Sequence, residues 1–454
     1  MDFEELVKAQ RDFFESGATR SFEFRRNALE KFRKGILKNE QAIADAMKKD
    51  FNKAADEVYM TETGLVLDEI RFHLKHLKKW MKRKNVRTPL AQFLSHSYIL
   101  PEPFGVSLIM SPWNYPIQLC FDPLIGAISA GCTAVVKPSA YAPETSNVIE
   151  KILSEAFPRE YIATVQGGRV QNAALLEQKF DYIFFTGSPT VGHLVMEKAA
   201  RYLTPITLEL GGKSPVIVDE SANIKIAARR VAFGKVLNAG QTCVEPDYLF
   251  IHKNVKARFV EAYKSALKEF FPDGNMSDMN VIINEKHYVR VKRLLKSGDI
   301  VLGGECNDET RFIAPTLLDN VSVDSEIMGE EIFGPILPML EYSDLETCID
   351  YIVHHPRPLA LYVFTQNKNI TNRIFNSCSF GGGCVNDTII HLATSFMPFG
   401  GVGDSGMGSY HGKKSFDTFT HYRSIVDKSC AIDLPIRYRP YTDMKRKLLR
   451  LFLH

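Results

Sequence analysis

The chain has 454 residues, 45% of them hydrophobic and 24% charged, which is enough material for large cores and for two or three domains. Its 56 lysines and arginines against 53 acidic residues leave a net charge of +3, so no nucleic-acid partner is expected. The chain has eight cysteines and no C-x-x-C pair, which predicts reduced thiols and no metal site. It has a charged start without a signal peptide and no apolar run of ~20 residues, which predicts a cytoplasmic location.

The expected elements divide the chain into segments of different periodicity. Residues 1–84 alternate polar and apolar side chains at helical spacing, and residues 86–102 carry prolines and scattered β-formers that predict an extended arm. From Gly105 onward, short segments rich in Val, Ile and Thr alternate with helix-like segments, and a second such region follows Cys243 to about residue 412. This alternation predicts an α/β fold with parallel sheets, whose ligands bind at the carboxyl ends of the strands.

Three motifs follow predicted strands in the first half of the chain. Asn114 lies in the segment SPWNYP, Lys137 ends the strand TAVV, and the turn 185–192 leads from a strand into a helix. Asn114 would present a rigid amide to an oxyanion, Lys137 would reach a ribose or phosphate oxygen, and the glycine turn would let backbone amides approach a phosphate. A satisfied loop asparagine, a solvated lysine and a plain structural turn are the alternatives.

Glu209 lies in a short β-like run between two leucines. These neighbours predict burial, which desolvates the carboxylate and raises its pKa, so that the group becomes a better base near neutral pH. The alternative is a charge on an edge strand or an ion-paired structural glutamate.

Cys243 is the candidate nucleophile. Apolar residues at helical spacing between 224 and 231 precede it, and a β-rich segment at 248–251 follows, so the cysteine lies on the loop between them. Gly240 would allow a tight turn that aims backbone amides at a charge developing beside the sulfur. A small buried apolar residue is the alternative for any single cysteine.

The C-terminal third carries three further features. His391 is expected to have only a supporting role, since a lone histidine is usually packed, and the glycine-dense segment 398–406 suits a loop close to a ligand or another chain. The stretch 444–454, MKRKLLRLFLH, sets apolar residues at helical spacing among basic ones. It is too short to span a bilayer but would lie on an anionic membrane surface; subunit packing and disorder are the alternatives.

Seven motifs occur in one order along the chain. Together they resemble the aldehyde dehydrogenases, and within them the short class 3 type that includes fatty and aromatic aldehyde dehydrogenases. The resemblance covers nearly the whole chain. The motifs are PWNYP at 112–116, KPS at 137–139, FTGSPTVG at 185–192, LELGGKSP at 208–215, GQTC at 240–243, EEIFGP at 330–335 and PFGGVGDSG at 398–406.

The resemblance implies an aldehyde dehydrogenase-like fold, with a Rossmann-type cofactor domain, a second α/β catalytic domain and a small bridging element used in oligomerisation. It also implies a homodimer. The corresponding ranges are 1–84 and 105–208 for the dinucleotide-binding domain, 209–412 for the catalytic domain, 85–104 and 413–440 for the bridging arm, and 441–454 for the C-terminal tail.

The resemblance further implies roles for individual residues. Cys243 would be the nucleophile, Glu209 the general base and Asn114 the oxyanion donor. The residues toward the cofactor would be Trp113, Lys137, Gly187, Ser188, Val191, Gly192, Glu331 and Phe333. The aldehyde side would be formed by Tyr115, Phe399 and His391.

The implied reaction is the oxidation of an aldehyde to the carboxylic acid with NAD or NADP. A thiolate adds to the carbonyl, hydride leaves the thiohemiacetal for the nicotinamide, and water activated by Glu209 hydrolyses the thioester. Many NAD-specific relatives carry a glutamate where this chain has Ala140, so NADP is predicted to be accepted beside NAD. The aromatic residues Tyr115, Phe396 and Phe399 favour medium-chain or aromatic aldehydes.

Two other functions fit parts of the pattern. An acylating aldehyde dehydrogenase would pass the thioester to coenzyme A, but such enzymes generally lack the glutamate that corresponds to Glu209. A structural homologue without activity would place no demand on Cys243, Glu209, Asn114 and Glu331 together.

Overall fold

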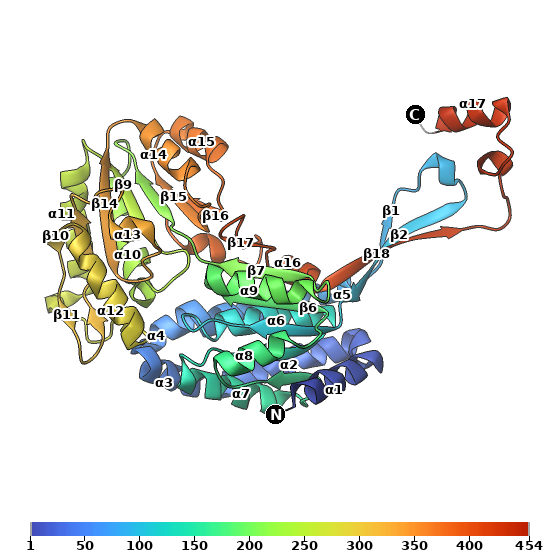
Figure 1. Ribbon diagram of the computed structural model, residues 1–454, viewed down its shortest axis with the longest axis horizontal. Helices are drawn as coiled ribbons and strands as arrows, with labels where there is room; N and C mark the ends of the chain where they lie inside the picture. Colours follow the sequence, from blue (N-terminus) through green and yellow to red (C-terminus); the bar gives the residue numbers. More distant parts are fainter. Residues whose placement is uncertain (1, 453–454) are drawn as a thin grey trace.

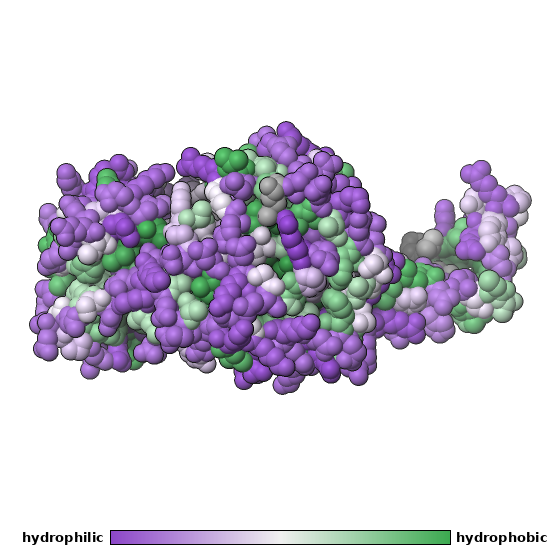
Figure 2. Space-filling model, turned by 90° about the horizontal axis from the view of Figure 1, so that it is seen from below, coloured by the Kyte–Doolittle hydropathy of each residue, from purple (hydrophilic) through white to green (hydrophobic). Residues whose placement is uncertain are grey.

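The computed structural model describes residues 2–452 as two α/β lobes, with a narrow arm projecting from one of them (Figure 1). Each lobe is built on a mostly parallel sheet that is covered by helices, which confirms the predicted α/β class. The surface in Figure 2 is mainly hydrophilic, and hydrophobic residues are mixed with hydrophilic ones along the projecting arm.

The first 80 residues form helices, as the periodicity predicts. The side chains of Asp2 and Ser21 accept backbone N–H groups at the starts of the first two helices. Of these helices, α2, α3 and α5 pack on α6 (Gln118–Ala130) or α7 (Pro143–Ala156), and a π-helical turn at Tyr59–Thr63 separates α4 from α5. Their bounds are α1 (Phe3–Glu15), α2 (Phe22–Lys38), α3 (Glu40–Phe51), α4 (Ala55–Val58) and α5 (Gly64–Trp80).

The first sheet has the strand order β17-β7-β6-β3-β4-β5, and its strands run parallel except for the short β17. Helices cover both faces, so the strands are almost continuous apolar runs and α6 is buried on every side. The strands are β3 (Val106–Met110), β4 (Thr133–Lys137), β5 (Ile162–Thr164), β6 (Tyr182–Gly187), β7 (Ile206–Leu210) and β17 (Gly406–Met407). The helices α8 (Arg169–Leu176) and α9 (Pro189–Ala200) complete this lobe.

The second sheet has the order β10-β13-β14-β9-β8-β15-β16, with an antiparallel pairing only between β10 and β13. The short segment 211–214 connects the two sheets. The strands are β8 (Pro215–Val218), β9 (Tyr248–His252), β10 (Asp299–Leu302), β13 (Thr316–Asp319), β14 (Ile336–Tyr342), β15 (Ala360–Phe364) and β16 (Gly382–Val385), and a small hairpin joins β11 (Cys306–Asn307) to β12 (Phe312–Ile313). The helices are α10 (Ile224–Val236), α11 (Lys256–Phe270), α12 (Glu285–Leu294), α13 (Glu326–Gly329), α14 (Leu345–Val353) and α15 (Lys368–Ser377).

The arm is a three-stranded antiparallel sheet of β1 (Lys84–Val86), β2 (Ser95–Pro103) and β18 (Thr420–Lys428). At its far end lies α17 (Asp443–Phe452), which has no buried residue (Figure 1). Among the described residues no helix is long and apolar enough to cross a membrane.

The predicted arm segment from residue 413 begins too early. Residues 413–418 form α16 (Lys413–Thr418), which packs on α6 inside the first lobe. Phe416 and Phe419 are buried there, and this apolar contact keeps the segment in the core until the chain leaves it at Thr420.

Candidate active site

Two cavities meet at Cys243. The larger, of about 880 Å³, lies between the carboxyl ends of the first sheet's strands and the second lobe. The smaller, of about 150 Å³, is lined mainly by apolar side chains. Four residues line both cavities: Leu119, Cys243, Phe399 and Tyr410. Molecules in the two cavities would therefore reach the same thiol.

The loop that carries Cys243 has a backbone conformation that side-chain-bearing residues rarely adopt. After α10 ends, Asn238, Ala239 and Gly240 have φ values of +52°, +51° and +70°. A Cβ at position 240 would fall 2.3 Å from the backbone oxygen of Gly334, so glycine is required there. Each positive φ at a non-glycine residue costs about 1 kcal/mol or more, which tertiary contacts must offset.

Side-chain amides supply those contacts. Asn238 Nδ2 donates to the carbonyl oxygens of Asn114, at 2.9 Å, and Gln241, at 3.0 Å. Gln241 Nε2 donates to the carbonyl of Asn238 at 3.0 Å, and its Oε1 accepts the backbone N–H of Ile283 at 3.0 Å. The loop is thereby fixed to both lobes.

Asn114 lies between β3 and α6, in the loop that is predicted to face an oxyanion. It is 4% exposed, lines the larger cavity and donates one amide hydrogen to the carbonyl of Gln241 at 3.0 Å. Beside it, the hydroxyls of Tyr115 and Thr242 share a hydrogen bond of 2.6 Å. The amide-bearing loop is thus joined to the cysteine-bearing loop immediately before Cys243.

Glu209 lies in β7 and lines the larger cavity. The residue is 3% exposed, and neither carboxylate oxygen has a hydrogen-bond partner among the described residues. This burial raises the pKa of the carboxyl well above its usual value. The alternatives of an edge-strand charge and of an ion pair do not hold within residues 2–452, since β7 lies between β6 and β17 and the carboxylate is unpaired.

The thiol of Cys243 shares the larger cavity with the carboxyl groups of Glu331 and Glu209. Burial raises its pKa, and so do the carboxylates of Glu331 and Glu209, whereas the backbone N–H groups of Cys243 and Val244 oppose the shift. The thiol is therefore protonated at neutral pH and must lose its proton when it acts as a nucleophile. Cys243, Glu209 and Glu331 all line the larger cavity, so the three groups face one space.

Glu331 comes from the motif EEIFGP and is held by the segment that connects the sheets. Its Oε1 accepts the backbone N–H of Gly212 at 3.1 Å, and a Cβ at Gly211 would come within 2.3 Å of its carboxylate. Burial, with the nearby Asp247 adding to it, raises the pKa of Glu331 to about 8. The carboxylate is thus presented to the cavity from a fixed position.

The rest of the larger cavity fits a dinucleotide. Gly187 and Ser188 line it at the start of α9, where the Ser188 side chain makes no capping bond. Pro189 has no N–H and the N–H of Val191 donates to the Ser188 carbonyl at 3.1 Å, so within the described residues the N–H of Thr190 is the one left for an anion in this first turn. Trp113 and Phe333 line the same cavity, with ring centroids 5.4 Å apart. The free amide of Thr190 suits a phosphate, the rings suit a flat group, and the Glu331 carboxylate suits ribose hydroxyls.

Three residues that the resemblance assigns to the cofactor do not line this cavity. A Cβ at Gly192 would come 2.7 Å from the side chain of Leu210, so this glycine allows α9 to pack closely on β7. Val191 follows Thr190, the last cavity-lining residue of that turn. Lys137 is buried, and its Nζ donates to the carbonyl of Pro138 at 2.7 Å.

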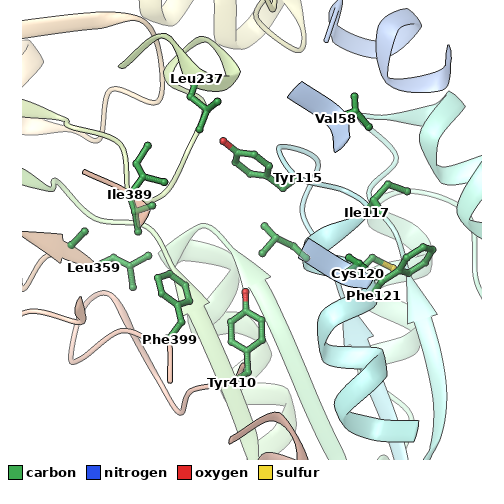
Figure 3. Packing of buried hydrophobic residues seen from close by; sticks show 14 of the residues in the cluster. Val58, Tyr115, Ile117, Cys120, Phe121, Leu237, Leu359, Ile389, Phe399 and Tyr410 are labelled. Carbon is green, nitrogen blue, oxygen red and sulfur yellow. The ribbon is translucent and has the colours of Figure 1, made fainter. Parts of the chain in front are cut away.

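Tyr115 and Phe399 line the smaller cavity, but His391 does not. His391 lies behind the wall, where its Nδ1 is 3.7 Å from the sulfur of Cys384. Phe396, expected near the aldehyde, is 84% exposed and packs on Phe72. Figure 3 shows how labelled side chains from both lobes surround this region, among them Tyr115, Leu237, Ile389, Phe399 and Tyr410.

Sequence reasoning missed lining residues on both sides. Those of the smaller cavity include Phe233, Leu237, Ile389, Ile390 and Leu392, which belong to no motif. The missed cations of the larger cavity are Lys213, Arg290 and Arg357. Lys213 had a signal, because it lies inside LELGGKSP. Arg290 had none, yet its guanidinium donates to the carbonyls of Glu331, at 3.1 Å, and Ile332, at 2.7 Å, and so fixes that motif.

The structure has two α/β lobes, a cleft at the carboxyl ends of a parallel sheet and a cysteine thiol at the end of that cleft. This arrangement is typical of α/β enzymes that bind a nucleotide cofactor and react through a cysteine. The aldehyde dehydrogenase family matches residues 1–425. A 4,4'-diaponeurosporen-aldehyde dehydrogenase of Staphylococcus aureus is 48% identical over 444 residues, or 97% of this chain and 96% of that protein. Human aldehyde dehydrogenase family 3 member B1 is 41% identical over 454 residues, or 98% and 96%. The chain therefore belongs to the aldehyde dehydrogenase family and resembles its class 3 type.

Solved structures of aldehyde dehydrogenases support the same family assignment. The substrate-bound state of Staphylococcus aureus AldH matches with a TM-score of 0.98 at 47% identity, and all of both chains is covered. A betaine aldehyde dehydrogenase variant from the same species, in complex with NAD+, matches with a TM-score of 0.85 at 25% identity, covering 96% of this chain and 90% of that one. The protein is an aldehyde dehydrogenase, which oxidises an aldehyde to the carboxylic acid with NAD(P)+.

Proposed function

We propose that Cys243 is the nucleophile of this oxidation, Glu209 the general base that activates water, and Asn114 an oxyanion donor. The observation that carries the assignment is the Glu209 carboxylate, which has no partner among the described residues and lines the same cavity as Cys243. A structural glutamate at this depth would be paired. An unpaired carboxylate with a raised pKa suits a base that acts near neutral pH.

The reaction begins when the Cys243 thiol gives its proton to solvent in the cavity and the thiolate sulfur attacks the aldehyde carbon. A C–S bond forms, and the new oxyanion accepts hydrogen bonds from the Asn114 amide and from a backbone N–H at Cys243. When bound, NAD(P)+ supplies the acceptor for the hydride that this carbon gives up. The resulting thioester is attacked by a water whose proton passes to Glu209, the C–S bond breaks, and the carboxylic acid leaves.

The cofactor is proposed to occupy the larger cavity with its phosphates toward the uncapped start of α9 and its nicotinamide ribose toward Glu331. The residues assigned to it are Trp113, Gly187, Ser188, Glu331 and Phe333. Lys137, Val191 and Gly192, which do not line the cavity, are proposed to support this site from behind.

NADP is proposed to be accepted beside NAD. The side chain of Ala140, which is exposed just after β4, adds no negative charge that would repel a 2′-phosphate. Rates measured with both nucleotides at saturation are expected to be comparable. A rate with NADP below about a hundredth of that with NAD, a difference of ~2.7 kcal/mol, would contradict this.

The substrate is proposed to be a medium-chain aliphatic or an aromatic aldehyde. The smaller cavity is lined mainly by apolar side chains, with Tyr115 and Phe399 beside Cys243. The relative from Staphylococcus aureus is named for 4,4'-diaponeurosporen-aldehyde, another apolar aldehyde. A panel of straight-chain and aromatic aldehydes is expected to give lower KM values than short polar aldehydes.

The assay that tests the function identifies the product. Purified enzyme is incubated with NAD and a medium-chain aldehyde, with and without coenzyme A. The expected product is the free acid in both cases, because Glu209 lines the cavity that also holds Cys243. A coenzyme A thioester would move the chain to the acylating enzymes, and no aldehyde-dependent reduction of either nucleotide would mark a silent homologue.

The enzyme is proposed to be a homodimer. β18 pairs with β2 on one side, and its other edge has no partner strand within the described part of the chain. Apolar side chains are also exposed on α9 and the turn after it, including Leu194, Met196 and, at 90%, Leu203. Free edges and apolar surfaces of this kind are usually covered. Light scattering on a size-exclusion column is expected to give twice the chain mass.

The helix α17 is proposed to lie on an anionic membrane surface in the cytoplasm. It exposes Met444 and Leu451 among Lys445, Arg446 and Arg450. All eight cysteines are free, in keeping with a reducing compartment. The enzyme is expected to sediment with phosphatidylglycerol vesicles but not with phosphatidylcholine vesicles, and to lose this binding when residues 441–454 are removed. Equal binding by the shortened chain would contradict the proposal.

A further inference from the structure

Two charged side chains that line neither cavity are buried beside the active site. Lys53 and Glu62 are both 0% exposed, and Lys53 Nζ lies 3.0 Å from Glu62 Oε1. A buried ion pair adds little net stability, because the loss of hydration offsets the attraction between the charges. The contacts that the pair makes with other segments indicate a different role.

Glu62 caps the helix that follows the Asn114 loop. Its Oε2 accepts the backbone N–H groups of Ile117, at 2.8 Å, and Gln118, at 3.3 Å, where α6 begins. No side chain of α6 caps this end, so a carboxylate from the π-helical turn takes the place of a local cap. The direction in which the chain leaves the Asn114 loop is therefore set by a group from another segment.

Lys53 extends this contact to Tyr115. Its ammonium lies 4.3 Å from the centroid of the Tyr115 ring, which is within the range of a cation–π interaction. The hydroxyl of the same tyrosine shares the 2.6 Å hydrogen bond with Thr242, the residue before Cys243. The ion pair is thus linked to the nucleophile loop through one aromatic side chain.

The segment that holds this pair also contacts the nucleophile loop directly. Glu57 Oε1 accepts the backbone N–H of Asn238 at 2.9 Å, where the stretch of positive φ begins. The segment contains the π-helical turn Tyr59–Thr63, an irregularity that is frequent at functional sites. Residues 53–62 therefore contact both loops that form the site, and they do so without lining the larger cavity.

We propose that Lys53 and Glu62 are positioning residues, which set the distance between the Asn114 amide and the Cys243 sulfur without touching substrate or cofactor. The inference rests on the proposed functions of Asn114 and Cys243. A displacement of ~1 Å in an active site costs up to ~10²-fold in rate, so loss of the pair lowers kcat and leaves the KM for NAD nearly unchanged.

The test compares the native enzyme with Glu62→Gln and with the double variant Lys53→Met/Glu62→Gln. The kcat is expressed per molecule recovered in the folded fraction from a size-exclusion column, so that unfolded molecules are not counted. Both variants are expected to lose about 10- to 100-fold in kcat. The double variant is expected to have the higher Tm of the two, since it buries no unpaired ammonium. A double variant that has a higher Tm than Glu62→Gln but no higher kcat is not the result of a merely structural role.

Asp50→Asn is the matched control. The Asp50 carboxylate is also buried and also caps a helix, accepting the backbone N–H groups of Glu144, at 3.2 Å, and Thr145, at 2.9 Å, at the start of α7. No residue of α7 lines either cavity. This variant is expected to have a lower Tm and an unchanged kcat per folded molecule.

The proposal is overturned if the double variant keeps kcat within about twofold of the native value, which is less than ~0.5 kcal/mol in the barrier. If Glu62→Gln does not fold, the kcat of the double variant alone decides whether the proposal holds. Cys243→Ser is assayed beside them. If it still oxidises aldehydes, the proposed function itself is wrong; if it is inactive while the double variant is fully active, only the positioning role is wrong.

Discussion

Two buried glutamates of this enzyme have opposite surroundings. Glu62 is fully buried and paired with Lys53, and its second oxygen accepts the backbone N–H groups of Ile117 and Gln118. Glu209 is 3% exposed, and neither of its oxygens has a partner among the described residues. A paired carboxylate holds backbone in place, whereas an unpaired carboxylate that lines a cavity is available to accept a proton. The comparison separates the region that fixes the geometry from the region that carries out the chemistry.

Amide side chains are divided in the same way between those that hold the backbone and those that are available to the reaction. Gln241 Nε2 donates to two carbonyl oxygens and its Oε1 accepts a backbone N–H, so this side chain serves the loop alone. Asn114, which lines the larger cavity, donates one amide hydrogen to the carbonyl of Gln241. Its other amide hydrogen is therefore available to an oxyanion. The following changes test whether the reacting groups and the positioning groups are divided in this way.

The largest effect is expected from Cys243→Ser, which removes the nucleophile from the chemical region. A serine hydroxyl is far less acidic than a thiol, so kcat for aldehyde-dependent reduction of NAD is expected to fall by about 10³-fold or more. Cys306→Ser, at a partly exposed thiol on the second lobe, is the control and is expected to be fully active. A Cys243→Ser variant within about tenfold of native activity would assign the chemistry to another group.

Asn114→Ala is expected to have the next largest effect. Removing one oxyanion donor costs about 10²- to 10³-fold in kcat, because the charge that develops on the aldehyde oxygen loses a hydrogen bond. The variant also loses the bond to the Gln241 carbonyl, so kcat is measured on folded protein after its Tm is known. Asn254→Ala, whose side chain contacts Glu220 at the surface, is the control. An effect confined to the KM for the aldehyde would contradict the oxyanion role.

Gly211→Ala tests the Glu331 carboxylate with a smaller change. The new methyl group would lie within 2.3 Å of that carboxylate and displace it from the larger cavity. The Kd for NAD, measured by quenching of protein fluorescence, is expected to rise about tenfold, or ~1.4 kcal/mol. Gly168→Ala is a matched control, since nothing lies within 4 Å of a Cβ there. Equal affinities of the two variants would remove Glu331 from the cofactor site.

The smallest expected effect is a gain in thermal stability, caused by Glu209→Gln. The folded-state pKa of Glu209 is raised above the unfolded value, so the folded protein resists ionising this group. The native enzyme therefore loses stability as the pH rises above the unfolded pKa of ~4.3, and Glu209→Gln does not. The Tm of Glu209→Gln is expected to exceed that of the native enzyme at pH 8, with a difference that shrinks toward pH 4. A lower Tm of the variant at pH 8 would mean that Glu209 has a partner.

Sequence alone was sufficient where a local pattern determines the outcome. The alternation of β-rich and helix-like segments predicted two α/β regions, and the loop around Cys243 follows from the helix before it and the strand after it. The leucines beside Glu209 predicted its burial, because they lie in a strand within the sheet. Motif order identified the family that the comparisons then confirmed.

Sequence alone failed where contacts between distant segments determine the position or the role of a residue. Lys53 and Glu62 belong to no motif, and their role depends on backbone groups of another segment. Gly192 lies inside a motif but is required by the side chain of Leu210, which no local pattern reveals. The exposure of Phe396 and the packing of residues 413–418 on α6 likewise follow from how the lobe closes.

The central claim is that Cys243 forms a covalent adduct and that Glu209 releases it. Mass spectrometry of Glu209→Gln after mixing with NAD and a medium-chain aldehyde tests it most directly. The account predicts that one equivalent of nucleotide is reduced rapidly, that turnover then stops, and that the peptide containing Cys243 carries the acyl group of the aldehyde as a thioester. Steady turnover to the free acid by this variant, or an acyl group found on any other residue, would contradict the account.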